Sequence, residues 1–508
     1  IKSFSFKISI IFIMTNPEHY IFSSKTVSEV DQRAIHQEGI PGFILMKRAA
    51  AFSFQQLERY FSNTNSIMIF CGSGNNSGDA YLLGCLAIEN EIKTKVITLC
   101  DTATLRDDAL KAFNEYQALD GEVFDWSNQI DIDCDLIIDG IFGIGINRNV
   151  EGEFLQAINT INKSKAPVLS LDIPSGLNAD TGEVMGSSIK ADVTSTFVGR
   201  KKGLYLNQGP LISGCIEFSN LSIPDKCFKN AKIELEIVNQ SLLKQHLKPR
   251  NRSSHKGDFG HVLVIAGNHG MGGAARITSE SALRTGAGLV SVITRPENVA
   301  IISKTTPEIM AHSADDKSDK ISELINKADV IAIGPGLGID RWAKDLFNKA
   351  IESEKQLIID ADGLNLLADC PTKRDNWILT PHPGEAARLL RCLNTEIQED
   401  RLNSLKKLIE KYGGVTLLKG NNTLIGAEEE IPFVVTAGNP GMSTAGMGDL
   451  LTGIIAALSS QFKKVNPKIL TALAAYIHAI AGDQAAKSGE RGIIATDLFK
   501  ELKNIINP

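Results

Sequence analysis

Short apolar runs rich in β-branched residues alternate with helical patterns along most of this 508-residue chain. In the first half these runs cover 67–71, 95–99, 136–139 and 168–172, with helical patterns at 81–89 and 107–119. In the second half the runs cover 261–266, 289–293, 330–333, 357–360, 377–380 and 415–419, with helical patterns at 468–487 and 496–505. Because buried parallel strands are continuously apolar and need helical crossovers, this alternation predicts an α/β fold.

The chain is too long for a single hydrophobic core, so two or more domains are expected. A polar segment at 224–254 has neither a strand nor a helix pattern and is the expected junction, which gives domains at 14–228 and 229–508. Residues 1–13 are expected to be an upstream extension, because the apolar patch Ile8–Ile13 is short, lacks a small-residue cleavage site and is followed by Met14.

The composition argues against several classes of protein. A net charge of -6 does not favour a nucleic-acid binder, and no apolar run reaches the roughly 18 residues of a membrane span. The 8 cysteines are scattered without a CxxC pair, which is typical of reduced core residues in a cytoplasmic protein. We therefore expect a cytoplasmic enzyme without nucleic-acid or membrane partners.

A glycine-rich stretch, Asn439–Asp449, runs directly into the apolar stretch Leu450–Leu458. Its glycines let backbone amides approach a ligand, and the N-terminus of the following helix attracts phosphate. Asp449 would lie on the first helical turn, where its carboxylate can accept a proton from an attacking hydroxyl. Phosphoryl transfer to an alcohol needs such an anion cradle beside a base. The alternative is a turn in which Asp449 only caps the helix.

Three strand-like runs of the first half end in oxygen-bearing side chains beside glycine. They lead into 72–79, 140–145 and 173–176. Because ligands of open α/β sheets bind at the carboxyl ends of strands, these turns are expected to share one site. Asn, Asp and Ser oxygens suit a hard cation and glycine-rich turns suit phosphates, although the same residues are also common in ordinary turns.

These motifs resemble those of the bifunctional NAD(P)H-hydrate repair enzymes. The first half carries the epimerase motifs of that family at 75–79, 139–145 and 171–176. The second half carries its dehydratase motifs at 255–260, 334–338, 380–385 and 446–449. The resemblance covers about 23–506 and implies a Rossmann-like three-layer epimerase domain followed by a ribokinase-like α/β dehydratase domain. It implies that the first half interconverts the R and S hydrates of NADH and NADPH (NADHX and NADPHX), and that the second half dehydrates the S form with ADP.

Carried over by motif, the resemblance assigns potassium to Asn76, Asp139 and Ser175 of the epimerase half. Asp172 is the implied acid or base, with Asp79 as the second choice. The residues implied to bind the hydrate are Asn75, Asn76, Ser77, Gly78, Asp79, Gly143, Ile144, Gly145, Ile146, Asn147, Arg148, Asn149 and Asp172. The family usually has glycine where this chain has Ser77 and Ala80, so a weaker epimerase is expected if those positions need positive φ.

In the dehydratase half, the resemblance implies that Asp449 takes the proton of the hydrate's C6 hydroxyl while the Gly446–Gly448 amides hold the transferred phosphoryl group. The implied hydrate ligands are Ala287, Gly338, His382 and Asp449. The implied nucleotide ligands are Lys419, Gly420, Asn421, Asn422, Thr423 and Gly448. Magnesium would bridge oxygens of the nucleotide, with Glu385 as an outer-shell helper.

Several alternatives stay open at the level of sequence. A ribokinase-like half can instead be a vitamin-type small-molecule kinase, and the first half can be a non-catalytic binding scaffold. The motifs do not decide whether ADP or ATP is the preferred nucleotide, or whether NADHX or NADPHX is the preferred substrate. A homo-oligomer, tetramer or larger, is expected by family analogy. Two further features fit either a ligand contact or plain structure: the basic turn 200–202 and the glycine-rich loop 267–273.

Overall fold

The computed structural model describes residues 17–314 and 318–507, and the chain divides between Leu235 and Glu236 into two compact units. The expected extension at 1–13 lies outside the described residues. The expectation that 224–254 lacks regular structure is wrong. This segment contains η4 (Asp225–Phe228), β10 (Leu235–Ile237) and α7 (Gln240–His246). Its scattered apolar side chains, among them Phe228 and Leu243, are buried, and so they order a stretch whose average composition is polar.

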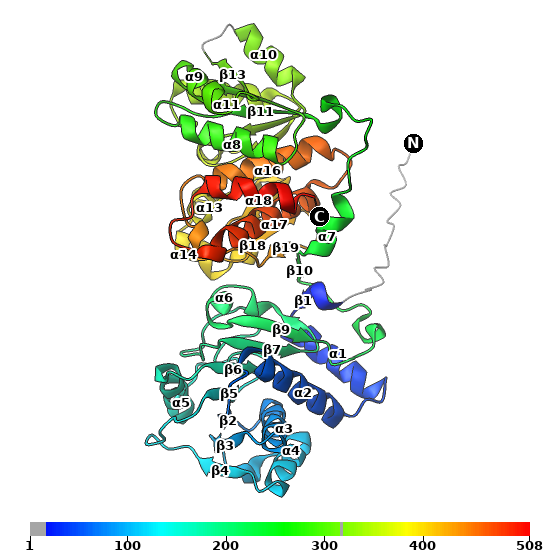
Figure 1. Cartoon of the computed structure of the whole chain (residues 1–508). Helices are drawn as coiled ribbons and strands as arrows, with labels where there is room; N and C mark the ends of the chain where they lie inside the picture. The colour runs from blue at the N-terminus through cyan, green and yellow to red at the C-terminus, as the bar shows by residue number, and fades with distance from the viewer. Residues whose placement is uncertain (1–16, 315–317, 508) are drawn as a thin grey trace. The chain divides into compact units, whose positions relative to one another are not determined.

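The first unit is built on a seven-stranded sheet in the order β4-β3-β2-β5-β6-β7-β9, with all neighbours parallel (Figure 1). The strands are β2 (Ser66–Cys71), β3 (Lys93–Thr98), β4 (Glu122–Asp125), β5 (Leu136–Gly140), β6 (Val168–Leu171), β7 (Val193–Phe197) and β9 (Cys215–Ser219). The strand order reverses between β2 and β5, which opens a crevice at their carboxyl ends. A separate short pair joins β1 (Tyr20–Phe22) to β8 (Arg200–Lys201).

Helices cover both faces of this sheet. One buried cluster joins alternate strand residues such as Ile67 and Ile69 to α1 (Ser24–His36), α2 (Gly42–Tyr60), α3 (Asn75–Glu89) and α4 (Asp107–Ala118). The opposite cluster joins Met68 and Phe70 to α5 (Gly152–Lys163), and the short α6 (Gly209–Ile212) precedes β9. The three-layer arrangement predicted from the sequence is therefore confirmed. One boundary differs, since α3 begins at Asn75 and not near 81.

The second unit contains a larger, mostly parallel sheet in the order β13-β12-β11-β14-β15-β16-β17-β18-β19. The strands are β11 (His261–Ile265), β12 (Leu289–Thr294), β13 (Met310–Ser313), β14 (Val330–Ile333), β15 (Gln356–Ile359), β16 (Trp377–Leu379), β17 (Val415–Leu418), β18 (Thr423–Ala427) and β19 (Phe433–Val435). Only the pairs β17–β18 and β18–β19 are antiparallel among these. The order reverses between β11 and β14, so a second crevice is expected at the carboxyl ends.

The helices of the second unit pack against this sheet and against each other (Figure 1). They are α8 (Gly272–Arg284), α9 (Pro296–Thr305), α10 (Ser318–Lys327), α11 (Arg341–Glu352), α12 (Asp362–Asp369), α13 (Pro383–Leu390), α14 (Asn394–Glu399), α15 (Arg401–Tyr412), α16 (Met447–Gln461), α17 (Pro467–Ala485) and α18 (Leu498–Ile505). Residues of α16 are buried along almost its whole length, which explains its continuous apolar sequence. Throughout 17–314 and 318–507, every helix is too short or too polar to cross a membrane.

Candidate active sites

The first site is a cavity of about 950 Å³ at the carboxyl ends of β2, β5 and β6. Of the residues that the sequence implied as hydrate ligands, the lining includes Asn75, Asn76, Asp79, Asp172 and the whole turn 143–149. Ser77 and Gly78 do not line it. Gly78 lies against Met46, because a Cβ there would come within 2.5 Å of the Met46 sulfur. The strand-end turns thus meet in one place, as the topology of a parallel sheet requires.

The residues at the start of α3 explain how this cavity can receive an anion. The helix is capped at Gly74 without a side-chain hydrogen bond, so the amides of Asn75 and Asn76 are left for a ligand, while the amide of Ser77 donates to the Gly74 carbonyl at 3.0 Å. Ser77 and Ala80 both lie inside α3 in right-handed helical geometry. Ser77 donates to the carbonyl oxygen of Gly74 at 2.6 Å. The backbone therefore does not need glycine at either position, and the departure from the family pattern creates no strain.

The three residues implied as potassium ligands lie close together: Asn76 and Ser175 both reach the carbonyl of Phe142, and Ser175 also contacts Asp139. Asn76 donates to that carbonyl at 2.9 Å, while its own Oδ1 is buried without a hydrogen-bond donor. Ser175 donates to Asp139 at 2.5 Å, and Asp139 is fully buried. Burial raises the pKa of Asp139, and the hydrogen bonds from Ser175 and Ser170 oppose the rise. An orphaned amide oxygen beside a hydroxyl and a buried carboxyl group suits a monovalent cation that prefers mixed oxygen ligands.

Asp172 follows β6 directly and forms an ion pair with Lys201 in the wall of the cavity. Its backbone has φ +65°, a left-handed conformation that is uncommon outside glycine. Its amide donates to the carbonyl of Ser195 at 2.6 Å. Lys201 is only 1% exposed, so the basic turn 200–202 is not a plain surface turn.

Two further carboxyl groups, Asp31 of α1 and Asp79 of α3, line the same cavity. Burial raises the pKa of Asp79 well above its ordinary value, and the negative charge of Asp172 adds to the rise. The pKa of Asp31 is raised for the same two reasons, with Lys201 opposing. The cavity therefore holds carboxyl groups in different electrostatic environments, which is an arrangement that acid–base chemistry uses.

The second site lies in the second unit, where α16 begins. Gly446 precedes the helix with φ +88° and no side chain caps its N-terminus. Asp449 lies on the first turn, as the sequence predicted. Burial raises the pKa of Asp449 to about 6, with the charge of Asp360 adding to the rise and Lys419 opposing it. Free helix amides beside a carboxylate of this kind can hold a phosphoryl group and accept a proton.

The ion pair of Lys419 and Asp360 lies next to the N-terminus of α16. Lys419 donates to Asp360 at 2.5 Å, and Thr452 of α16 donates to the same carboxylate at 2.7 Å. A Cβ placed on Gly448 would come within 3.2 Å of the Lys419 ammonium nitrogen, so glycine permits their close approach. Although burial raises the pKa of Asp360, Lys419 and its hydrogen bonds bring it below the ordinary value. The pair therefore places a positive charge beside the helix amides.

The loop implied to bind the nucleotide, 419–423, joins β17 to β18, and the side chain of Arg401 binds its carbonyl groups. This guanidinium is buried and donates to the carbonyls of Leu418 and Lys419 at 3.2 Å, and to that of Asn422 at 3.2 Å. It also donates to the carbonyl of Asn421. Gly420 has φ +146°, and a Cβ there would come within 2.7 Å of the guanidinium. One side chain thus sets the shape of the loop.

His382 and Glu385 form a capping box at the start of α13, beside the same ion pair. His382 Nδ1 accepts from the amides of Gly384 and Glu385 at 3.0 and 3.3 Å, and Glu385 accepts from the amide of His382 at 2.8 Å. Burial raises the pKa of Glu385 to about 7, while Lys419 opposes the rise. The histidine therefore has a structural role whether or not a ligand touches it.

The structure does not bring Ala287 to these residues. The other implied ligands follow the carboxyl ends of β14, β16 and β17 or begin α16, whereas Ala287 precedes β12. Because β11, β12 and β14 are parallel, the start of β12 lies at the opposite edge of the sheet. The turn that does lie at the carboxyl edge is 267–273, the glycine-rich loop that follows β11.

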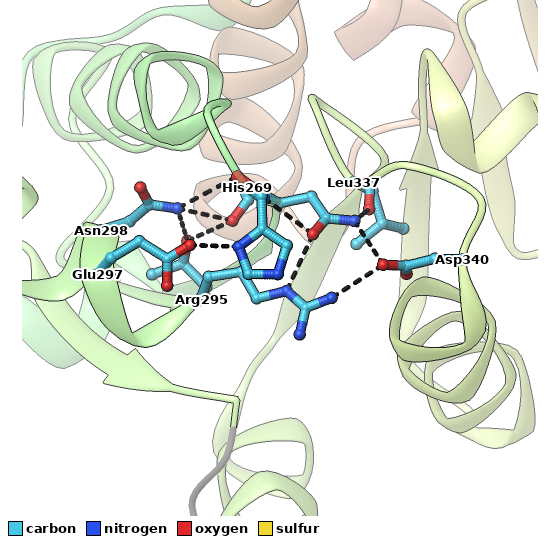
Figure 2. A network of polar contacts seen from close by, with 9 residues as sticks. His269, Arg295, Glu297, Asn298, Leu337 and Asp340 are labelled. Carbon is cyan, nitrogen blue, oxygen red and sulfur yellow. Dashed lines mark hydrogen bonds and ion pairs between the residues drawn. The ribbon is translucent and has the colours of Figure 1, made fainter.

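This loop is tied to the turn containing Gly338 by the polar network in Figure 2. Asn268 donates to the carbonyl of Leu337 at 2.9 Å and to Asp340 at 3.2 Å. Arg295 donates to Asn268 and to Asp340, each at 2.9 Å. Gly338 has φ +74° and leaves room for the Asn268 amide, which a Cβ would approach to 2.6 Å. The network fixes two loops at the edge of the second crevice.

Comparison with known proteins decides the family. A family model described as YjeF-related protein N-terminus matches residues 42–203, and one described as NAD(P)H-hydrate dehydratase matches residues 262–504. A bifunctional NAD(P)H-hydrate repair enzyme from Coxiella burnetii (strain RSA 493 / Nine Mile phase I) is 40% identical over 96% of this chain and 99% of its own length. The chain belongs to the bifunctional NAD(P)H-hydrate repair enzyme family. The relative from Escherichia coli (strain K12) is 38% identical, over 96% of this chain and 94% of its own length.

The second unit of this chain also resembles solved structures. A ribokinase-like superfamily protein from Enterococcus faecalis V583 is 31% identical, with a TM-score of 0.50, and the match covers 54% of this chain and 95% of that protein. A hypothetical protein from Streptococcus mutans is 33% identical, with the same TM-score, over 53% of this chain and 98% of its own chain. The ribokinase-like fold predicted for the second half is thus confirmed.

Three side chains of these sites were not singled out from the sequence, and a fourth, Lys201, was considered only as a possible contact to a ligand phosphate. Asp360 directly follows β15, as other motif residues follow their strands, so the same strand-end rule could have found it. Asp31 and Arg401 lie in ordinary helical patterns, and no local signal marks them. Lys201 was noticed only within a basic turn, and its pairing with Asp172 depends on contacts across the fold.

Proposed function

We propose that this chain repairs hydrated NADH and NADPH, with an epimerase site in the first unit and a nucleotide-dependent dehydratase site in the second. The observation that carries the dehydratase proposal is Asp449 on the first turn of the uncapped helix α16, beside the Lys419–Asp360 pair. Helix amides and a nearby cation suit a transferred phosphoryl group, and the carboxylate suits its acceptor hydroxyl.

In the dehydratase reaction, Asp449 accepts the proton of the C6 hydroxyl of the S hydrate while that oxygen attacks the β-phosphorus of ADP. AMP leaves, and the amides of 446–448 hold the transferred group. The nitrogen lone pair of the ring then expels phosphate from C6, and loss of a proton from C5 restores the double bond. Phosphorylation turns a poor leaving group into a good one, which is a physical reason to consume a nucleotide.

The loop 419–423 and Gly448 would hold the nucleotide, since Arg401 fixes the loop while Lys419 reaches the start of α16. Mg²⁺ would enter with the nucleotide and supply charge neutralisation at its phosphate oxygens. His382 and Gly338 would contact the hydrate from the carboxyl ends of β16 and β14, the two strands that flank β15. Ala287 is not part of this proposed site, because it precedes β12 at the other edge of the sheet.

In the epimerase reaction, the first cavity would bind the R or S hydrate, with its phosphates on the first turn of α3 and on 143–149. Asp172 would move the proton needed to break and remake the bond at C6. Asn76, Asp139 and Ser175 would hold K⁺, and the unpartnered Oδ1 of Asn76 supports this assignment. The cation would supply a fixed positive charge at the edge of the cavity.

Location and assembly are proposals as well. The 8 cysteines are all free, which suits a reducing cytoplasm. A homo-oligomer, tetramer or larger, is proposed because soluble enzymes commonly form closed symmetric assemblies. Light scattering coupled to size-exclusion chromatography tests the assembly, and a monomeric mass would refute it.

The function is tested by following absorbance at 340 nm after purified protein is added to mixed NADPHX epimers with Mg²⁺, K⁺ and either ADP or ATP. Nucleotide-dependent return of NADPH from both epimers is expected, and the faster nucleotide settles the preference. Return of the S fraction alone would refute the epimerase. A stable phosphorylated product without NADPH would favour a small-molecule kinase.

A further inference from the structure

We infer that Lys201 is a positioning residue of the first site, and that it fixes the Asp172 carboxylate as the group that accepts a proton from the bound ligand. The inference rests on the epimerase function proposed above, but it concerns a side chain to which the motifs gave no such role.

The ammonium of Lys201 is held from three directions. It donates to the Thr196 hydroxyl at 3.1 Å, to the Phe197 carbonyl at 2.7 Å and to Oδ1 of Asp172. An ammonium group has three protons, so these acceptors use its full donor capacity. The side chain is 1% exposed and therefore cannot swing out to a phosphate. Its role must be exerted through Asp172.

Asp172 is in turn held by its backbone. The backbone of Asp172 has a left-handed φ of +65°, and its amide donates to the carbonyl of Ser195. These two features end the extended conformation of β6 and fix the orientation of the residue. Lys201 occupies Oδ1, while Oδ2 lies 3.8 Å from the position that a Cβ on Gly143 would take. Gly143 itself lines the cavity, so Oδ2 is the oxygen nearer to the turn proposed for the ligand.

Lys201 also decides the charge balance of the cavity. The ionisable side chains that line it are Asp31, Asp79, Asp108, Arg148, Glu151, Asp172 and Lys201. Lys201 binds Asp172 directly and opposes the rise in the pKa of Asp31 and Asp79 through space. Without this cation, the Asp172 carboxylate would lose its direct ion-pair partner and would lie beside the carboxyl groups of Asp31 and Asp79, which line the same cavity. The carboxylate would then be held less well as the base.

The test replaces Lys201 by methionine, which keeps the length of the side chain and removes the charge. Interconversion of purified R and S NADPHX is followed by chromatography, without nucleotide, across a range of pH. We expect kcat to fall by about 10- to 100-fold, less than the roughly 10²–10⁴-fold attributed to an acid–base group itself, because Asp172 stays in place. We expect KM to change less than about twofold and the acidic limb of the kcat profile to move to higher pH.

The matched control is Lys202→Met, which removes the neighbouring positive charge. Lys202 pairs with Glu234 at 4.0 Å and does not line the cavity, so kcat should stay at the wild-type value. Dehydration of the S epimer by the same Lys201→Met protein reports on the second unit and should also stay unchanged. A Lys201→Met variant whose KM rises while kcat is retained would refute positioning.

If Lys201→Met abolishes the thermal unfolding transition of the first unit, the inference is tested with Lys201→Arg instead. Arginine retains the cation and changes its geometry. A lowered kcat with the acidic limb at its wild-type pH is expected, and a wild-type kcat would overturn the inference. A wild-type chain that interconverts no epimers would instead refute the proposed epimerase function.

Discussion

Removing the Lys419 ammonium should destabilise the second unit, because Asp360 is left as a buried charge without its cation. The Asp360 side chain is 2% exposed and that of Lys419 20%, and they are 2.5 Å apart. Breaking a buried pair by removing one partner costs about 3–5 kcal/mol. Thr452 still donates to Asp360 at 2.7 Å, so we expect Lys419→Met to cost about 3 kcal/mol, at the lower end of that range.

This cost corresponds to a fall of roughly 6–12 °C in the Tm of the second unit, at about 2–4 °C per kcal/mol for a unit of this size. Differential scanning calorimetry of the full chain measures it. The double variant Lys419→Met with Asp360→Asn removes the unpaired charge and should recover much of the loss. Lys463→Met is the control, because its pair with Asp329 is exposed and should contribute at most about 1 kcal/mol. A double variant no more stable than Lys419→Met would refute the reasoning.

The same pair predicts how the stability difference depends on pH. In the folded protein the pKa of Asp360 lies below its ordinary value, so its contribution is complete above about pH 4, the unfolded value, and is lost as the pH falls through the folded value. In Lys419→Met the carboxyl group can take up a proton at low pH and is no longer an unpaired charge. The gap in Tm between the variant and the wild type should therefore narrow as the pH is lowered.

Four other outcomes are expected. Asp449→Asn should lower kcat of S-hydrate dehydration by about 10²–10⁴ and leave epimer interconversion unchanged, as chromatography of both reactions would reveal. Because the pKa of Asp449 is about 6 and its carboxylate is the proposed base, wild-type dehydration should decline as the pH falls through about 6; a flat profile would contradict this role. Gly420→Ala should raise KM for ADP, since its Cβ would lie 2.7 Å from Arg401, while Gly74→Ala has open space and should not change dehydration. Replacing K⁺ by Na⁺ should slow epimerisation in the wild type, and Asn76→Leu should remove that difference between the cations. A difference that persists in Asn76→Leu would refute Asn76 as a ligand of the ion.

The local pattern of the chain anticipated much of the fold. Continuous β-branched runs such as 136–139 are buried strands because both faces of a parallel sheet are covered by helices. The stretch after Gly446 is a buried helix with Asp449 on its first turn, as glycine followed by a long apolar run predicts. Prediction failed at 224–254, where a few apolar residues bury a short strand and helix within a polar average.

Local patterns in the sequence therefore identified the central strands of both sheets, several of the helices and the turns at which glycine and oxygen-bearing residues gather. These properties depend on neighbours along the chain, and a local pattern records them. The packing of distant segments was needed to show that Lys201 pairs with Asp172, that Arg401 donates to carbonyls of the loop 419–423, and that Ala287 lies at the edge of its sheet opposite to the other implied ligands. These facts depend on which distant segments pack together and in which direction each strand runs. A buried charge must be paired, and its partner can come from a residue that is far away in the sequence.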